Sequence, residues 1–215
     1  MESKRGNNLH RLEQKNLILK FLLIGDYGVG KTAIARRYTD GKFSSNYKLT
    51  VGAEFSMKVI RWDANTIVNI QLWDIAGQER FGYMTRVYYK NAVGCAIVFD
   101  ISRLSSYNSV VKWLKDLRKK VVFDDGRDIP VILLANKWDI GECCACDEAI
   151  NKLCREVGLS TWFKISAKEN LNIDKAMNYL IEEVLNTWIE KSETSETNCI
   201  DLLQSDKPKE NSCCK

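Results

Sequence analysis

Short apolar runs recur along most of the chain, and their length predicts β-strands. Those at 93–100 and 129–135 are predominantly apolar, as expected for strands that a parallel sheet buries on both faces. The other strand-like segments are 17–24, 53–61, 66–73 and 161–165. Only a short turn-rich segment separates 53–61 from 66–73, so this adjacent pair is expected to contribute one antiparallel edge strand.

Apolar residues at helical spacing predict helices between and after these strands. One such face is formed, in an i, i+3, i+4, i+7 pattern, by Val110, Trp113, Leu114 and Leu117. Further helices are expected at 31–38, 148–157 and 173–189. Residues 39–51 have no clean period and are expected to form a loop. This alternation predicts an α/β fold, with a mostly parallel six-stranded sheet, one antiparallel edge strand and helices on both faces.

The 215-residue chain is expected to form one domain, at 16–190, between two irregular ends. Residues 1–15 are polar and predict a mobile arm, and the Ser-, Asn-, Glu- and Lys-rich residues 191–215 predict a disordered tail. The composition is that of a soluble protein, and a net charge of +4 is too small to indicate a nucleic-acid partner. No stretch resembles a signal peptide or membrane span, so we expect an intracellular protein.

Residues 25–33, GDYGVGKTA, follow the first expected strand and fit two phosphate-binding patterns. Gly28, Gly30 and Ala33 match the dinucleotide fingerprint G-x-G-x-x-G/A, which leaves the adjoining lysine and threonine without a role. The segment also matches the P-loop pattern G-x-x-x-x-G-K-[ST] of nucleoside-triphosphate-binding proteins. A plain glycine turn between a strand and a helix is the structural alternative to both.

The P-loop interpretation uses every residue type in the segment. Backbone N–H groups would wrap the phosphates, and glycines would let the backbone approach closely. Lys31 would neutralise β- and γ-phosphate oxygens, and the hydroxyl of Thr32 would bind Mg²⁺.

Residues 73–78, WDIAGQ, follow another expected strand and would complete the phosphate site. Asp74 could reach the metal through water, Gly77 could donate its N–H to the γ-phosphate, and Gln78 could orient the attacking water. Taken alone, an aspartate at the end of a strand is more often a turn residue or a helix cap.

Residues 136–139, NKWD, also follow a strand and would select the base. The carboxylate of Asp139 can accept hydrogen bonds from guanine N1 and N2, whereas adenine offers no matching pair of donors. A plain turn explains this tetrapeptide alone about as well, and SAK at 166–168 is a weaker third motif. Together, the ordered motifs at strand ends indicate a guanine-nucleotide site and argue against an ATPase or small-molecule kinase.

GDYGVGKT, WDIAGQERF, NKWD and SAK, in this order and spacing, resemble the small GTPases of the Ras superfamily. VGAEF at 51–55, YYKNA at 88–92 and IVFDIS at 97–102 resemble the Rab branch, over roughly residues 16–190. Ile75 and the stretch MTRVYYK are similar to the subfamily that serves lysosomes and lysosome-related organelles. The resemblance implies a P-loop small-GTPase fold and a GTP/GDP switch that hydrolyses GTP slowly and recruits effectors in membrane trafficking.

The resemblance also implies a role for each matching position. The catalytic residue would be Gln78. The side chains that bind Mg²⁺ would be Thr32, Thr50 and Asp74. The contacts to GTP or GDP would be Gly28, Val29, Gly30, Lys31, Thr32, Ala33, Phe43, Tyr47, Thr50, Gly77, Asn136, Lys137, Asp139, Ser166, Ala167 and Lys168. An aromatic triad that binds effectors, or that simply packs in the core, would be Phe55, Trp73 and Tyr88.

The implied partners are effector proteins, an exchange factor, a GTPase-activating protein, a prenylation escort and a GDP-dissociation inhibitor. Tyr27 departs from the family pattern, which has a small residue at this position. A bulky side chain beside the γ-phosphate could crowd the water held by Gln78, so a GTP-binding scaffold with little turnover is the alternative function. The ring could instead lie outward over the nucleotide.

The chain carries two groups of cysteines with different expected roles. Cys213 and Cys214 resemble the Rab signal for two geranylgeranyl groups, which would anchor the protein to the cytoplasmic face of lysosomal or related membranes. Two stray cysteines in a disordered end are the alternative. The second group is Cys143, Cys144, Cys146 and Cys154. Because adjacent cysteines rarely chelate one ion well, a cysteine-rich loop and helix is favoured over a zinc site.

Overall fold

The computed structural model describes residues 14–46, 48–78 and 85–203, with side-chain surroundings through Ile189. Its strands are β1 (Lys15–Ile24), β2 (Ala53–Arg61), β3 (Thr66–Ile75), β4 (Gly94–Asp100), β5 (Val131–Asn136) and β6 (Thr161–Lys164). Its helices are α1 (Lys31–Asp40), α2 (Thr85–Tyr89), α3 (Leu104–Lys120), α4 (Asp147–Val157) and α5 (Ile173–Leu203). A 3₁₀ turn, η2 (Trp138–Ile140), follows β5.

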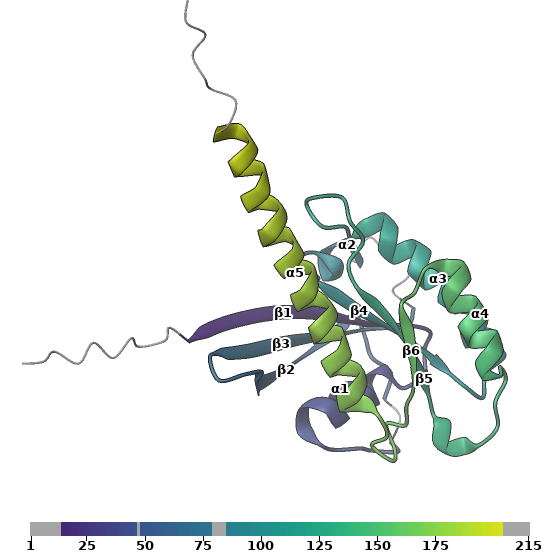
Figure 1. Cartoon of the computed structure of the whole chain (residues 1–215). Helices are drawn as coiled ribbons and strands as arrows, with labels where there is room; N and C mark the ends of the chain where they lie inside the picture. The colour runs from purple at the N-terminus through teal and green to yellow at the C-terminus, as the bar shows by residue number, and fades with distance from the viewer. Residues whose placement is uncertain (1–13, 47, 79–84, 204–215) are drawn as a thin grey trace, which may run out of the picture.

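Within the described part of the chain, six strands form one sheet in the order β2-β3-β1-β4-β5-β6 (Figure 1). β2 pairs antiparallel with β3, and every other neighbouring pair is parallel. The predicted α/β fold, with a single antiparallel edge strand, is therefore confirmed.

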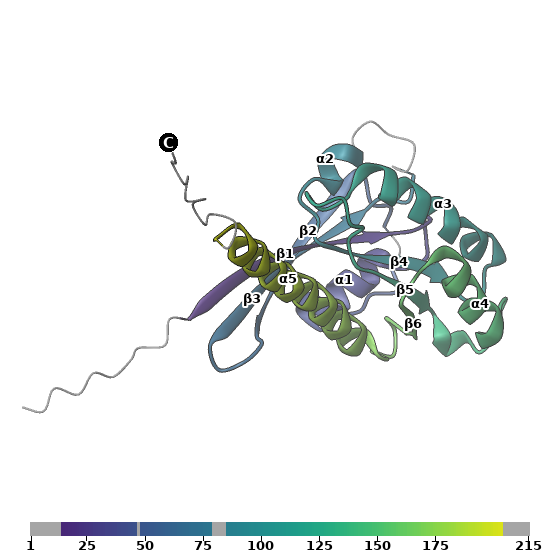
Figure 2. The same ribbon diagram turned by 45° about the horizontal axis from the view of Figure 1, so that its top comes forward.

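Helices cover both faces of the sheet, α1 and α5 on one and α2, α3 and α4 on the other (Figures 1 and 2). In β1, Phe21 and Leu23 pack with the α1 and α5 cluster, whereas Leu22 and Ile24 pack with the opposite cluster. The predicted stripe on α3 is buried, at Val110, Trp113, Leu114 and Leu117. Burying each side chain of this size contributes about 1.5–3 kcal/mol to the stability of the fold. The helices on both faces are therefore packed firmly against the sheet.

The C-terminal helix is longer than the sequence predicts. α5 begins at Ile173 as expected but continues to Leu203, beyond the expected end at residue 189. This segment contains neither glycine nor proline, and the first proline after it is Pro208, so nothing in its residue types stops a helix. Figures 1 and 2 show the end of α5 projecting beyond the sheet.

Parallel pairing brings the ends of several strands to one edge of the sheet. Leu22 of β1 aligns with Trp73 of β3, and Asp100 of β4 aligns with Asn136 of β5. Since parallel strands end on the same side, the loops after β1, β3 and β5 meet there. The four sequence motifs follow these strands and β6.

Candidate functional site

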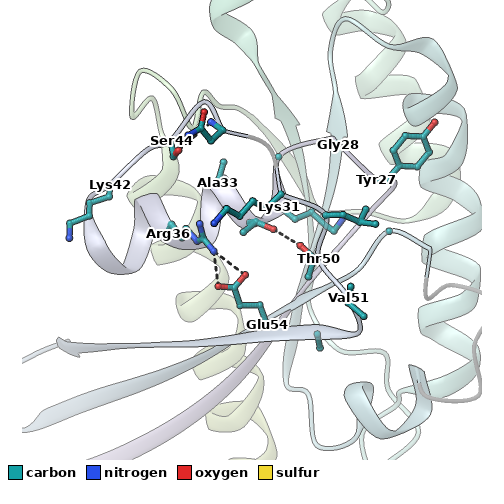
Figure 3. A pocket seen from close by; sticks show the side chains of 17 residues that line it. Tyr27, Gly28, Lys31, Ala33, Arg36, Lys42, Ser44, Thr50, Val51 and Glu54 are labelled. Atoms are coloured by element: carbon teal, nitrogen blue, oxygen red, sulfur yellow. Dashed lines mark hydrogen bonds and ion pairs between the residues drawn. The ribbon is translucent and has the colours of Figure 1, made fainter.

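A cavity of about 490 Å³ opens at this edge, between the loop after β1 and the segment that enters β2 (Figure 3). Of the predicted nucleotide contacts, it is lined by Gly28, Gly30, Lys31, Thr32, Ala33, Thr50 and Gly77. The predicted base contacts after β5 and β6 do not line it. Arg36 and Glu54, which no motif identified, form a 3.0 Å ion pair that joins α1 to β2 beside the cavity.

The loop after β1 approaches its neighbours too closely for side chains at two glycines. A Cβ atom on Gly30 would lie 2.3 Å from Asn136 Nδ2, and one on Gly77 would lie 2.2 Å from the backbone nitrogen of Tyr27. Gly30 also has a φ of 99°, in the left-handed region that glycine adopts without strain. These approaches join the loop after β1 to the loop after β3 and to the last residue of β5.

Lys31 places a buried cation inside the glycine loop. The residue is only 6% exposed, and its ammonium donates to the carbonyl oxygens of Gly25 and Asp26, at 2.9 Å each. Burial lowers the pKa of Lys31 to about 8, against the opposing effect of Asp74 and Asp26. An anion in the cavity would favour the charged form, so this geometry suits a phosphate group.

Thr32, Thr50 and Asp74 bring three side-chain oxygen sites together. The hydroxyl of Thr32 lies 2.9 Å from that of Thr50 and donates to Asp74 Oδ2. Asp74 is 1% exposed, and its Oδ1 has no hydrogen-bond partner among the described residues. An orphaned carboxylate oxygen beside two hydroxyls is a donor set that Mg²⁺ accepts, either directly or through water. The residues therefore fit the metal that the motifs implied.

Asp74 gives a pH-dependent prediction for the metal-free, nucleotide-free protein. Burial raises the pKa of Asp74 to about 6 from its ordinary 3.8, so the folded protein holds this proton more tightly than the unfolded chain. Lowering the pH from 7 to 5 should therefore stabilise the fold through this group, by about 1 kcal/mol.

Urea unfolding at the two pH values checks this, with Asp74→Asn as the matched variant. Since asparagine does not titrate, its stability should gain less over this range than that of the original protein. Equal changes in the two proteins would contradict the assigned titration.

On the opposite side of the glycine loop, Asn136 joins two of the predicted motifs. Its amide nitrogen donates to the carbonyl oxygen of Val29 at 2.8 Å, and its amide oxygen accepts from the backbone N–H of Ala167 at 3.2 Å. Asp139 is oriented by Ser166, whose hydroxyl donates to its Oδ1 at 2.6 Å. The carboxylate predicted to select guanine is thus held by the loop after β6.

Lys137 and Lys168 lie beside these groups. Lys137 has a φ of 67°, and its ammonium forms a 2.7 Å ion pair with Asp100 at the end of β4. Lys168 Nζ lies 3.8 Å from Asp139 Oδ2. Sequence reasoning missed Asp100 as a structural partner, although its position at a strand end was a usable signal.

Arg37 connects Phe43 to the same region. Its guanidinium donates to the carbonyl oxygens of Ala167 and Lys168, at 2.9 Å each, and lies 5.8 Å from the centre of the Phe43 ring. Phe43 therefore lies on the side of the site formed by residues 166–168, as its predicted contact with the base requires. No motif identified Arg37, because its role depends on contacts 130 residues away.

Four further predicted site residues are not placed at the cavity by the described part of the structure. Gln78 is exposed and does not line the cavity, although Gly77 before it does. Tyr47, Cys213 and Cys214 lie outside the described residues. Their predicted roles therefore stay predictions.

Phe55, Trp73 and Tyr88 meet on the face of the sheet that carries α2. The Phe55 and Trp73 ring centres are 5.5 Å apart, and those of Trp73 and Tyr88 are 6.5 Å apart. Phe55 is 47% exposed, whereas Trp73 and Tyr88 are half-buried against the core. Surface exposure and core packing, which sequence reasoning treated as alternatives, thus coexist in one cluster.

The described cysteines of the second group occupy two environments. Cys143 and Cys146 are exposed in the loop before α4, Cys144 is half-buried there, and Cys154 is buried within the helix. Across the described segments, no cluster of three or more His, Cys, Asp or Glu side chains has a metal-binding arrangement.

A glycine loop with a buried lysine, a threonine–aspartate pair at a second strand end and an oriented aspartate at a third define a P-loop nucleotide-binding protein. The Ras family model matches residues 20–186. The chain is 46% identical over 195 residues to the Ras-related protein Rab-32 of Homo sapiens, covering 90% of this chain and 86% of that protein. It is 45% identical over 205 residues to Rab-32A of Dictyostelium discoideum, covering 92% and 94%.

A further relative is Rab-7L1 of Rattus norvegicus, 40% identical over 193 residues that cover 89% of this chain and 95% of that protein. The chain belongs to the Ras family, in which it is a Rab GTPase related to Rab-32 and Rab-7L1. As such it is a GTP-binding switch of vesicle trafficking with GTPase activity. Its general partner kinds are effectors, exchange factors, GTPase-activating proteins and GDP-dissociation inhibitors.

None of the helices in the described segments has both the length and the apolar character needed to cross a bilayer.

Proposed function

We propose that this Rab GTPase switches effector recruitment on lysosome-related organelles through Mg²⁺-dependent binding and slow hydrolysis of GTP. The observation that carries the proposal is the contact of Thr50 with Thr32 beside Asp74. Thr50 belongs to the irregular segment before β2, so one hydroxyl connects that segment to the phosphate-binding loop. A ligand that draws Thr50 toward this loop orders the segment, and its loss releases the segment.

Each residue of the site would have a separate role in GTP hydrolysis. Lys31 binds the phosphates, while Thr32, Thr50 and Asp74 would hold Mg²⁺. The metal would supply positive charge to the β- and γ-phosphate oxygens. Gln78, whose side chain is exposed, would orient the attacking water, and the proposal includes a slow intrinsic rate.

The orientation of Tyr27 supports a working switch over the alternative of a GTP-binding scaffold. That alternative requires the ring to crowd the γ-phosphate. Tyr27 is 65% exposed, and Figure 3 shows its hydroxyl pointing away from Lys31 and Thr50. A ring in this position leaves the phosphate side of the cavity open to water.

The proposal also includes membrane attachment through two prenylated cysteines. Cys213 and Cys214 would carry the lipids, since two chains give stable anchoring and one gives only marginal binding. The domain would span 16–190 and the tail 191–215, of which α5 supplies the first part. Colocalisation of the labelled full chain with lysosomal membrane markers tests the proposed organelle.

The nucleotide that copurifies with the full chain tests the chemistry. Denaturation followed by chromatography should release mainly GDP, because slow turnover during preparation converts bound GTP. Mainly GTP would favour the scaffold, and adenine nucleotides would contradict the assignment of Asp139.

Gln78→Leu is expected to slow single-turnover GTP hydrolysis by about 10-fold or more, since leucine cannot orient water. Hydrolysis of preloaded GTP in a single turnover measures the effect. GDP dissociation, followed with a fluorescent analogue, should stay within about twofold because Gln78 does not line the cavity. An unchanged hydrolysis rate would remove Gln78 from the mechanism.

A further inference from the structure

The backbone of Tyr27 is held between two neighbours on opposite elements. On one side lies Gly77, whose hypothetical Cβ atom would be 2.2 Å from the Tyr27 nitrogen. From the start of α3, Arg103 Nη2 donates to the Tyr27 carbonyl oxygen at 2.6 Å. The chain at this point therefore has little freedom to move, although its side chain is exposed.

Arg103 also contacts the Tyr27 ring. Its guanidinium carbon lies 5.3 Å from the ring centre, within the range of a cation–π interaction. The same guanidinium reaches the next residue, because a Cβ atom on Gly28 would lie 3.6 Å from Arg103 Nη1. One side chain thus binds the glycine loop through both its backbone and its aromatic group.

The position of Arg103 is fixed by the start of α3. Its N–H donates to the Asp100 carbonyl oxygen at 2.9 Å, and its own carbonyl oxygen accepts from the Ser106 hydroxyl at 2.7 Å. Arg103 Nε is buried without a hydrogen-bond partner among the described residues. The Arg103 guanidinium makes both its hydrogen bond and its ring contact with Tyr27. This geometry indicates that Arg103 holds Tyr27 in place.

A different side-chain torsion of Tyr27 would place its ring where it interferes with GTP. Tyr27 lines the cavity together with Lys31 and Gly77, so rotation about its first side-chain torsion would carry the ring toward the phosphate side. There it would occupy space that the γ-phosphate and attacking water need. In Figure 3 the Tyr27 hydroxyl points away from Lys31 and Thr50, which leaves that space open.

We propose that Arg103 is a positioning residue that stacks Tyr27 outward and so keeps the γ-phosphate side of the cavity open. It acts through Tyr27, and it is not among the residues that line the cavity. The inference rests on the proposed hydrolytic switch and deepens it. It explains how the glycine loop can carry a bulky side chain at Tyr27, through a residue that lies outside the sequence motifs.

The test compares Arg103→Ala in the original chain and in a Tyr27→Gly background. Loss of the stack and its hydrogen bond should lower single-turnover GTP hydrolysis by about 3- to 10-fold in the original chain. In the Tyr27→Gly background the same substitution should change the rate by less than about 1.5-fold, since no ring remains to swing inward. Arg103→Lys should recover most of the rate, because lysine keeps the charge and a donor.

A second measurement needs no turnover and separates this inference from the proposed function. An inward ring excludes the γ-phosphate more than the β-phosphate, so Arg103→Ala should lower GTPγS affinity relative to GDP affinity by about threefold. This change should also vanish in the Tyr27→Gly background.

Equal losses in both backgrounds, or an unchanged rate and affinity ratio, would overturn the positioning role. If the original chain hydrolyses no GTP, the proposed turnover fails, and the affinity ratio alone decides the role of Arg103. Thermal unfolding of each variant with GDP bound identifies any general loss of folding.

Discussion

Replacing Asp139 with asparagine is expected to weaken GDP binding by about 10²- to 10⁴-fold. The carboxylate can accept two hydrogen bonds from guanine, at N1 and N2, and a hydrogen bond to a charged group is worth about 1.5–3 kcal/mol. The side chain is only 14% exposed, and Ser166 orients it at 2.6 Å, so the acceptor is already in position before the base arrives. An asparagine amide would turn a donor toward a donor.

Equilibrium titration with fluorescent GDP measures the loss, and xanthosine diphosphate supplies the matched control. Xanthine has a carbonyl oxygen where guanine has its exocyclic amine, so the amide of the Asp139→Asn variant can donate to it. Affinity for the xanthine nucleotide should therefore rise while affinity for GDP falls. If both nucleotides lose affinity equally, the substitution has disrupted the loop and Asp139 does not read the base.

The phosphate side of this site could be predicted because the residues that would bind phosphate are adjacent in the sequence. Gly30, Lys31 and Thr32 follow one another, and a strand before them with a helix after them fixes how they point. The strands were predictable for a similar reason, since β4 and β5 are short, apolar and buried on both faces. Where local sequence alone determines geometry, a pattern is sufficient.

Other parts depend on contacts between distant residues and have no local signature. Arg37 reaches residues 167 and 168, and Arg103 reaches Tyr27 across 76 positions, so neither role follows from spacing. The short helix α2 was not predicted, because five residues span little more than one helical turn and cannot show a repeated apolar spacing. The extension of α5 was missed because a polar composition indicated disorder, although the segment contains no helix-breaking residue.

Replacing Lys31 with methionine is the second large effect, with an expected loss of GDP affinity of about 10²- to 10⁴-fold. The ammonium is nearly buried, and its own burial lowers its pKa to about 8, so it is poorly solvated before an anion arrives. Negatively charged phosphate oxygens would stabilise the ammonium group in place of the water that burial has removed. Methionine has a similar length but offers neither charge nor a donor to the phosphates.

Lys42→Met provides the control, because Lys42 also lines the cavity but is exposed to solvent. Removing the same formal charge there should weaken GDP binding by less than about threefold, since exposed charges are screened by water and salt. Titrations of both variants at two salt concentrations separate the effects: the Lys42 loss should shrink at high salt and the Lys31 loss should persist. Similar losses in the two variants would mean that net charge around the cavity, and not the ammonium held by Gly25 and Asp26, governs phosphate binding.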